Sequence, residues 1–248
     1  IPLIASSIMS KKIAEGTGAL VLDVKVGTGA FMKTREQATE LARTMVDLGT
    51  DAGVRTVALL TEMSIPLGLT AGNAMEVRES VEVLAGGGPS DVVELPVRLA
   101  EEMLEAAGRG GQDVRAALND GRAMDAWRAM ISAQSGDPDA VLPTARHTET
   151  VVATQDGILT TLDAYAVGIA AWRLGAGRAR KEDPVQAGAG VEMNDKPGDR
   201  VTKGQTLMTL HTDTPERFAR ALDALDGGWS ITAQGPTQAA PLVIDRIA

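Results

Sequence analysis

The first part of the chain alternates apolar runs of period two with stretches of helical period, which predicts a layered domain. Residues 19–26 (ALVLDVKV) and 54–61 (VRTVALLT) are rich in β-branched residues and predict two buried strands. Between them, the apolar residues over 38–45 fall on one helical face, and Thr34 with Gln37 forms a capping box before them. The order strand, helix, strand is typical of an α/β domain.

Further helices are predicted on both sides of this pattern. The first covers residues 5–15, with Ser6 or Ser7 as a suitable N-cap and Gly16 as its end. Its two lysines lie towards the C-terminal end, where the helix dipole favours cations. Later in the chain, helices are predicted over residues 74–85, 95–107 and 113–133.

The last hundred residues consist of short extended pieces separated by Gly, Asp and Pro, which predicts a β-rich module. We therefore expect an α/β domain over 16–146 and a C-terminal β-rich α+β module over 147–248. A short helix over 215–225 and a final apolar strand over 241–247 complete that module. The expected fold class is α/β, with a mixed sheet flanked by helices and a half-barrel-like module after it.

Composition excludes several classes of function. The net charge of −9 argues against a general nucleic-acid binder, which needs a basic face. The absence of cysteine excludes disulfides, thiol catalysis and cysteine-ligated zinc, and two histidines are too few for a His-rich metal centre. No apolar run is long enough to span a bilayer. The chain starts at Ile1 without an initiator Met, and we interpret this start as a cut boundary.

Ser7 and Lys11 are the first candidate binding residues. They are four apart in the first predicted helix, so their side chains share a face one turn apart. The ammonium is suited to an oxygen that gains negative charge, and the hydroxyl to a neighbouring ring nitrogen. The alternative is a capping serine and a solvated lysine, which is common on helices.

The loop GTGAF follows the first predicted strand directly. Its glycines let the backbone approach a ligand at the carboxyl edge of a sheet, where α/β proteins place their sites. Phe31 is suited to pack against a planar ring. The alternative is a tight turn in which Phe31 fills the core, because one G-x-G is neither a dinucleotide fingerprint nor a Walker loop.

Three further motifs have weaker signals. Glu79, close after the loop that contains Pro66, has the oxygen chemistry of a main-group cation ligand, although a surface glutamate is the alternative. His147 and His211 lie beside turns without catalytic partners at suitable spacing, which favours structural or surface roles. The stretch that contains Lys196 is similar to the hairpin of biotinyl and lipoyl carrier domains. It lacks their lysine between two methionines, so carrier function is not expected.

Residues 1–32, IPLIASSIMSKKIAEGTGALVLDVKVGTGAFM, closely resemble the base-binding segment of the thymidine and pyrimidine-nucleoside phosphorylase family. The likeness continues through GVRTVALLTEMSIPLG and AGNAMEVRES, and the C-terminal module looks like the closing domain of that family. The resemblance thus covers essentially the whole chain. Its first segment is the most specific, because Ser-x-x-x-Lys-Lys, a strand and VGTGAF match in order.

The resemblance implies reversible phosphorolysis, in which a pyrimidine nucleoside and phosphate give the free base and (deoxy)ribose 1-phosphate. It places Ser7 and Lys11 on the pyrimidine ring and Ile4 and Phe31 in the apolar base pocket. Lys11 would stabilise the negative charge that spreads into the base carbonyls as the glycosidic bond breaks. Phosphate is the co-substrate, and no organic cofactor is expected.

The resemblance also implies a potassium ion, held by two loop carbonyls and a glutamate that match Leu67, Thr70 and Glu79. It implies a cytoplasmic homodimer without nucleic-acid or membrane partners. Residues 1–15 would be the remnant helix of an α lobe that is mostly missing. The family's phosphate-binding loops would precede Ile1, so we expect the 248 residues alone to show no phosphorolysis.

Two other classes of function remain open from the sequence. One is a phosphoribosyltransferase of related fold, which needs a diphosphate-ribose site. The other is a non-catalytic binding or regulatory module that kept both parts and lost catalysis. The choice between thymidine alone and a broader range of pyrimidine nucleosides also stays open.

Overall fold

The computed structural model describes residues 1–235 and 241–248, and their contacts define two compact units. Unit 1 contains residues 1–63, 93–117 and the C-terminal residues from 241. Unit 2 contains residues 64–92 and 118–235. The segments 64–92 and 118–146, which were expected in the α/β domain, thus fold with the β-rich part of the chain. Among the described residues, no helix combines the length and apolar character needed to cross a membrane.

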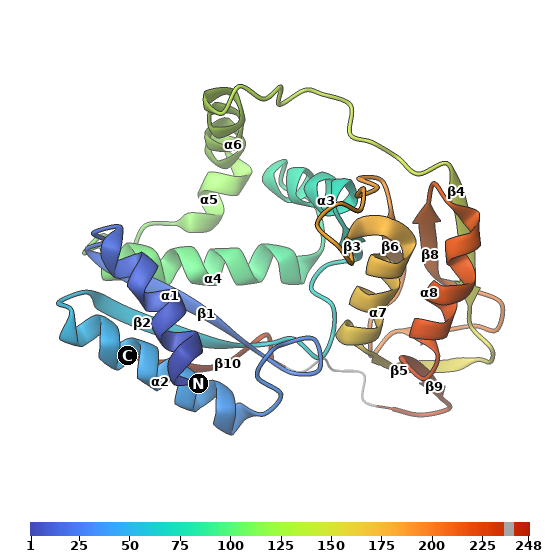
Figure 1. Ribbon diagram of the computed structural model, residues 1–248, viewed down its shortest axis with the longest axis horizontal. Helices are drawn as coiled ribbons and strands as arrows, with labels where there is room; N and C mark the ends of the chain where they lie inside the picture. The colour runs from blue at the N-terminus through green and yellow to red at the C-terminus, as the bar shows by residue number, and fades with distance from the viewer. Residues whose placement is uncertain (236–240) are drawn as a thin grey trace. The chain divides into compact units, whose positions relative to one another are not determined.

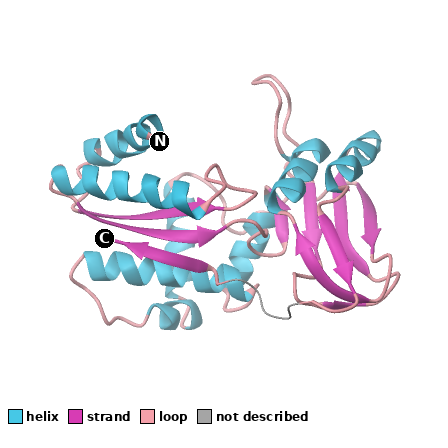
Figure 2. Cartoon of the chain, turned by 90° about the horizontal axis from the view of Figure 1, so that it is seen from below, coloured by secondary structure: helices cyan, strands magenta, loops and turns pink. Residues whose placement is uncertain are grey.

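Unit 1 is built on a three-stranded mixed sheet in the order β1-β2-β10 (Figure 1). β1 (Ala19–Val26) pairs parallel with β2 (Arg55–Glu62), and α2 (Arg35–Asp51) makes the crossover between them. β10 (Val243–Ile247) pairs antiparallel with the other edge of β2. Helices lie on both faces of this sheet (Figure 2). The predicted mixed α/β fold with flanking helices is confirmed.

The start of α2 confirms the predicted N-cap. The backbone N–H of Gln37 donates to Thr34 Oγ1 at 3.3 Å, while the side-chain Oε1 of Gln37 accepts from the backbone N–H of Lys33 at 3.2 Å. The returning bond therefore reaches the residue before the cap instead of the cap itself. The apolar face of α2 is buried, including Leu41 and Met45, and packs against β2.

The first helix begins earlier than predicted. α1 spans Pro2–Ala14, with Pro2 in its first turn, where a missing N–H and a fixed φ are favourable. Ser6 and Ser7 lie inside the helix and cap nothing, so that part of the prediction was wrong. The predicted end is confirmed, because Gly16 follows α1 with a left-handed φ of 71°.

The last strand has a different partner from the one expected. Residues 241–247 were expected in the C-terminal module, whereas β10 pairs with β2 in unit 1. An apolar strand pattern specifies which face is buried but does not specify the neighbouring strand, so the pattern alone could not decide this pairing.

The predicted helix over 113–133 is two helices, because Gly121 between them has a φ of 88° that interrupts the helical backbone. The helices after β2 are α3 (Ala74–Leu84), α4 (Ser90–Ala106), α5 (Val114–Asn119) and α6 (Arg122–Ala133).

Figure 2 shows the strands of unit 2. They form two antiparallel sheets, in the orders β3-β6-β8-β4 and β7-β5-β9. Its strands are β3 (Thr70–Gly72), β4 (His147–Val152), β5 (Gly157–Leu162), β6 (Gly190–Met193), β7 (Arg200–Val201), β8 (Thr206–Thr212) and β9 (Trp229–Thr232). Besides α3 and α6, its helical elements are α7 (Ala164–Ala171), the helical turns η1 (Trp172–Ala176) and η2 (Pro215–Arg217), and α8 (Phe218–Leu225). Fully buried residues such as Leu159, Leu174 and Leu210 form one core. The β-rich character predicted for this part of the chain is confirmed.

Candidate functional site

Ser7 and Lys11 both lie on the exposed side of α1. The helix buries Ala5 and Met9 against the core of unit 1, and Ile4 is half-buried against the same core. In the described part of the chain, no residue accepts a hydrogen bond from the Lys11 ammonium or the Ser7 hydroxyl. Both groups are therefore available to a ligand, and their assignment to a base stays a prediction.

The loop after β1 is a tight turn whose apolar side chain points outward. Gly27 has a φ of 135°, and its N–H donates to the Met32 carbonyl at 3.0 Å. The Gly29 N–H donates to the Met63 carbonyl at 2.9 Å, which ties the loop to the end of β2. Phe31 is 83% exposed, so it does not fill the core. An exposed aromatic side chain on a well-anchored loop is suited to contact a planar ligand.

A polar cluster that was not predicted from the sequence lies near the carboxyl ends of β1 and β2. Lys25 Nζ lies 2.6 Å from Asp23 Oδ2, and the Thr61 hydroxyl donates to the other carboxylate oxygen of Asp23. Two charged residues two positions apart in an apolar strand were the available signal, because alternate residues share one face. The cluster lies on the two strands that lead into the Gly27–Met63 region of unit 1.

Glu79 is a buried glutamate of α3, with 9% of its surface exposed, which excludes the surface interpretation. Its Oε1 accepts from the Leu69 N–H at 2.8 Å. Burial raises the pKa of Glu79, while the Leu69 N–H bond, the Thr70 hydroxyl and the Lys196 ammonium oppose that rise. A Cβ at Gly68 would lie 2.1 Å from Glu79 Oε2, and Gly68 has a φ of 69°. Glycine at 68 is thus required for this approach of the backbone to the carboxylate.

The surroundings of Glu79 fit the oxygen chemistry of a cation. The Thr70 Oγ1 atom is buried and makes no hydrogen bond of normal geometry with the described residues, although it is close enough to stabilise the Glu79 charge. Lys196 Nζ donates to the Pro66 carbonyl and lies 3.1 Å from Asp91 Oδ2, so this segment already attracts one positive charge. Because that ammonium is engaged internally, Lys196 does not resemble the exposed lysine of a carrier domain.

A test of the Glu79 environment follows from its raised pKa. The folded protein binds this proton more tightly than the unfolded chain. The stabilising contribution is therefore complete below the ordinary pKa of 4.5 and is lost as the pH rises through the folded pKa. We expect Glu79→Gln to remove this loss and to raise the free energy of unfolding at neutral pH in potassium-free buffer. Urea unfolding across the acid-to-neutral range measures it. Glu82→Gln is the control, because Glu82 is an exposed residue of the same helix. An equal increase in the free energy of unfolding in that variant would contradict the assignment to Glu79.

The two histidines do not form a catalytic pair. His147 is exposed at the start of β4, and His211 Nε2 lies 3.3 Å from Glu192 Oε2 beside a cavity of about 620 Å³ in unit 2. No cluster of three or more His, Cys, Asp or Glu residues suited to a metal occurs among the described residues. The cation site predicted around Glu79 is not a cluster of this kind, because it would consist of carbonyls, a hydroxyl and one glutamate.

Two known protein families match parts of this chain. The family described as "Glycosyl transferase family, a/b domain" matches residues 1–124, and "Pyrimidine nucleoside phosphorylase C-terminal domain" matches residues 158–232. The chain belongs to this glycosyl transferase family.

Individual proteins similar to this chain are named as thymidine or pyrimidine-nucleoside phosphorylases. A thymidine phosphorylase of Mycobacterium tuberculosis is 60% identical over 247 residues, which cover 100% of this chain and 58% of the relative. A pyrimidine-nucleoside phosphorylase of Staphylococcus epidermidis is 41% identical over 258 residues, with 100% and 59% covered. One of Bacillus subtilis is 44% identical over 224 residues, with 86% and 52% covered. The resemblance seen in the sequence is confirmed, and the chain spans less than two thirds of these relatives.

Proposed function

We propose that the protein containing this chain is a pyrimidine nucleoside phosphorylase, which converts thymidine and phosphate reversibly into the free base and deoxyribose 1-phosphate. Uridine and deoxyuridine are further substrates within this proposal. The observation that carries it is the ammonium of Lys11 one turn from the hydroxyl of Ser7, both without protein partners among the described residues. Support comes from relatives named as phosphorylases that match the chain from end to end.

In this proposal the residues of unit 1 bind the base and stabilise it as it departs. The Lys11 ammonium donates to a base carbonyl oxygen, and this bond strengthens as negative charge develops there. The Ser7 hydroxyl fixes the ring orientation through a ring nitrogen or the adjacent carbonyl. Ile4 and Phe31 supply apolar contacts to the ring faces. The chemistry needs no covalent intermediate on these residues.

A potassium ion belongs to the same proposal. Leu67 and Thr70 would hold it through backbone carbonyls and Glu79 through its carboxylate, with further ligands from elsewhere in the full-length protein. The buried carboxylate with its raised pKa and the buried Thr70 hydroxyl support this assignment, because a cation would offset the unfavourable burial of charge. The ion would supply positive charge that fixes the loop around Gly68. A homodimer in the cytoplasm is the assembly and location we propose.

The test uses the full-length protein with thymidine or uridine. We expect release of the free base that requires phosphate and produces one equivalent of sugar 1-phosphate, measured by absorbance and phosphate consumption. Base release without phosphate would indicate a hydrolase and would overturn the proposal. Base consumption with phosphoribosyl diphosphate, in the absence of phosphorolysis, would support the phosphoribosyltransferase instead.

A further inference from the structure

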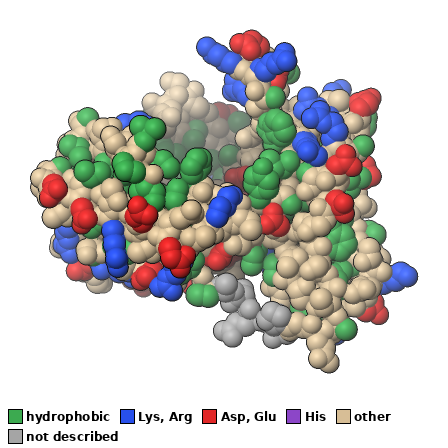
Figure 3. Space-filling model, turned by 60° about the horizontal axis from the view of Figure 1, so that its bottom comes forward, with side chains coloured by type: hydrophobic (Ala, Val, Ile, Leu, Met, Phe, Trp, Pro, Cys, Tyr) green, Lys and Arg blue, Asp and Glu red, His purple; other side chains and the backbone are tan. Residues whose placement is uncertain are grey.

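Three arginines of unit 2 line one small cavity. Arg173 of η1, Arg217 of η2 and Arg220 of α8 surround a space of about 230 Å³, together with Trp172. At the top of Figure 3, Lys and Arg side chains lie together with Asp and Glu side chains on a projecting part of the surface and beside it. In a chain with a net charge of −9, three arginines around one cavity are a local exception.

The charges of these arginines are not neutralised by ion pairs within the described residues. Arg173 Nη1 donates to the Arg220 carbonyl at 2.6 Å, which fixes that guanidinium but supplies no negative charge. Asp183 is the one acidic residue among those that line the cavity, and its Oδ2 is held by the N–H groups of Ala179 and Arg180. Three guanidinium groups thus share the lining with one carboxylate, so the lining keeps a net positive charge that attracts an anion.

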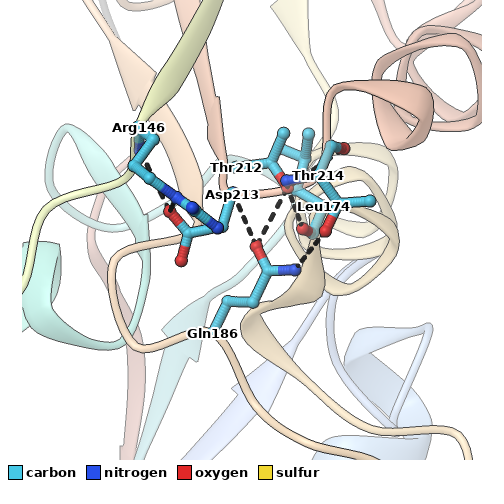
Figure 4. A network of polar contacts seen from close by, with 6 residues as sticks. All are labelled: Arg146, Leu174, Gln186, Thr212, Asp213 and Thr214. Carbon is cyan, nitrogen blue, oxygen red and sulfur yellow. Dashed lines mark hydrogen bonds and ion pairs between the residues drawn. The ribbon is translucent and has the colours of Figure 1, made fainter.

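A polar network holds the backbone on which these arginines stand (Figure 4). The Thr212 hydroxyl donates to the Leu174 carbonyl at 2.7 Å, next in sequence to Arg173. Gln186 Oε1 accepts from the Asp213 N–H at 2.7 Å, and its amide nitrogen donates to Thr214 Oγ1 at 2.9 Å. These bonds tie η1 and the loop before Gln186 to the segment that leads into η2. The backbone that carries Arg173 and the backbone that leads to Arg217 are therefore held in fixed positions.

Two glycines allow close packing at the cavity, Gly177 as one of its lining residues and Gly175 through its approach to Arg217. A Cβ at Gly175 would lie 2.8 Å from Arg217 Nη1, and Gly175 has a φ of 118°, so a side chain there would displace the guanidinium. A Cβ at Gly177 would lie 2.7 Å from Cδ1 of Trp172. The indole is thus packed against backbone on one side and supplies an apolar wall beside the arginines.

We propose that this cavity binds a phosphate group, either as inorganic phosphate or as a small phosphate monoester. Arginine guanidinium groups match phosphate oxygens through paired hydrogen bonds. The volume is below the usual range for drug-sized ligands, about 300–1,000 Å³, which favours a small anion. This inference is independent of the proposed phosphorolysis, because it rests on residues of unit 2 that the base-binding proposal does not use.

Hydrogen exchange measured by mass spectrometry tests the site locally in the full-length protein. We expect inorganic phosphate and ribose 5-phosphate to protect the peptides that cover residues 172–186 and 214–222, saturably, and chloride at equal ionic strength to leave them unprotected. Arg217→Gln and Arg220→Gln should each raise the phosphate concentration for half-maximal protection at least about tenfold, because each removes charged hydrogen bonds. Protection by ribose 5-phosphate at lower concentration than by phosphate would identify the monoester as the ligand.

Arg200→Gln is the matched control, since Arg200 is an exposed arginine of the same unit outside the cavity. It should leave the protection unchanged. The proposal is overturned if chloride protects equally, if the Arg217 and Arg220 variants keep normal protection, or if Arg200→Gln loses as much as they do. Unchanged exchange of the β8 peptide in every variant would show that the fold is retained.

Discussion

Replacement of Lys11 by alanine in the full-length protein is expected to lower kcat/KM for thymidine by about 10²–10³-fold, the usual effect of removing one donor to a developing oxyanion. Lys11 is exposed and has no partner among the described residues, so the fold loses no internal contact with it. The loss should fall mainly on kcat, because the ammonium stabilises charge that appears only as the glycosidic bond breaks. Steady-state kinetics measure the changes in kcat and KM, and a circular dichroism spectrum shows whether the fold is retained.

Lys12→Ala is the control for this experiment. Lys12 is the neighbouring lysine, and its Nζ lies 3.0 Å from Oε2 of Glu15, the residue that caps the C-terminal end of α1. An exposed pair of this kind contributes about 1 kcal/mol or less, so both stability and turnover should stay near those of the parent. Near-normal turnover in Lys11→Ala, or an equal loss in Lys12→Ala, would remove Lys11 from the mechanism.

The local elements were predictable because their signals lie within a few residues of each other. The run 19–26 is β1 as predicted, and Thr34 caps α2 with its hydroxyl on the Gln37 N–H. The spacing of Ser7 and Lys11 predicted that they share one helix face, and the structure shows that both are exposed. The predicted start of α1 was wrong, because the helix begins at Pro2. Serine is a common N-cap residue, so a serine inside a helix can be mistaken for the cap.

Properties that depend on residues far apart could not be predicted. Glu79 is buried because α3 packs over the loop at Gly68, and no pattern around Glu79 distinguishes it from a surface residue. The arginine-lined cavity joins Arg173 with Arg217 and Arg220, which are more than forty positions away and come together through α7–α8 packing. The pairing of β10 with β2 belongs to the same class of long-range contact.

Glu102 offers a test of how β10 is held in unit 1, because its side chain connects α4 to β10. Its carboxylate is buried, with 5% of the residue exposed, and accepts from Arg98 Nη2 at 2.6 Å and from Arg246 Nε at 3.0 Å. Glu102→Ala leaves both guanidinium groups without this acceptor. Removal of one partner from a fully buried pair costs about 3–5 kcal/mol. Because both arginine side chains are about two fifths exposed, we expect solvent to reduce the loss to about 2 kcal/mol.

Urea unfolding measures that loss, and hydrogen exchange of the peptide covering residues 241–248 locates it. Glu101→Ala is the matched control, since Glu101 is the exposed neighbour whose Oε2 lies 3.4 Å from Arg98 Nη1. It should change the free energy of unfolding by about 0.5 kcal/mol or less. Faster exchange of the C-terminal peptide in Glu102→Ala alone would show that the carboxylate holds β10 against the rest of unit 1. Equal effects from the two variants would mean that general charge on α4, and not the contact with Arg246, stabilises this strand.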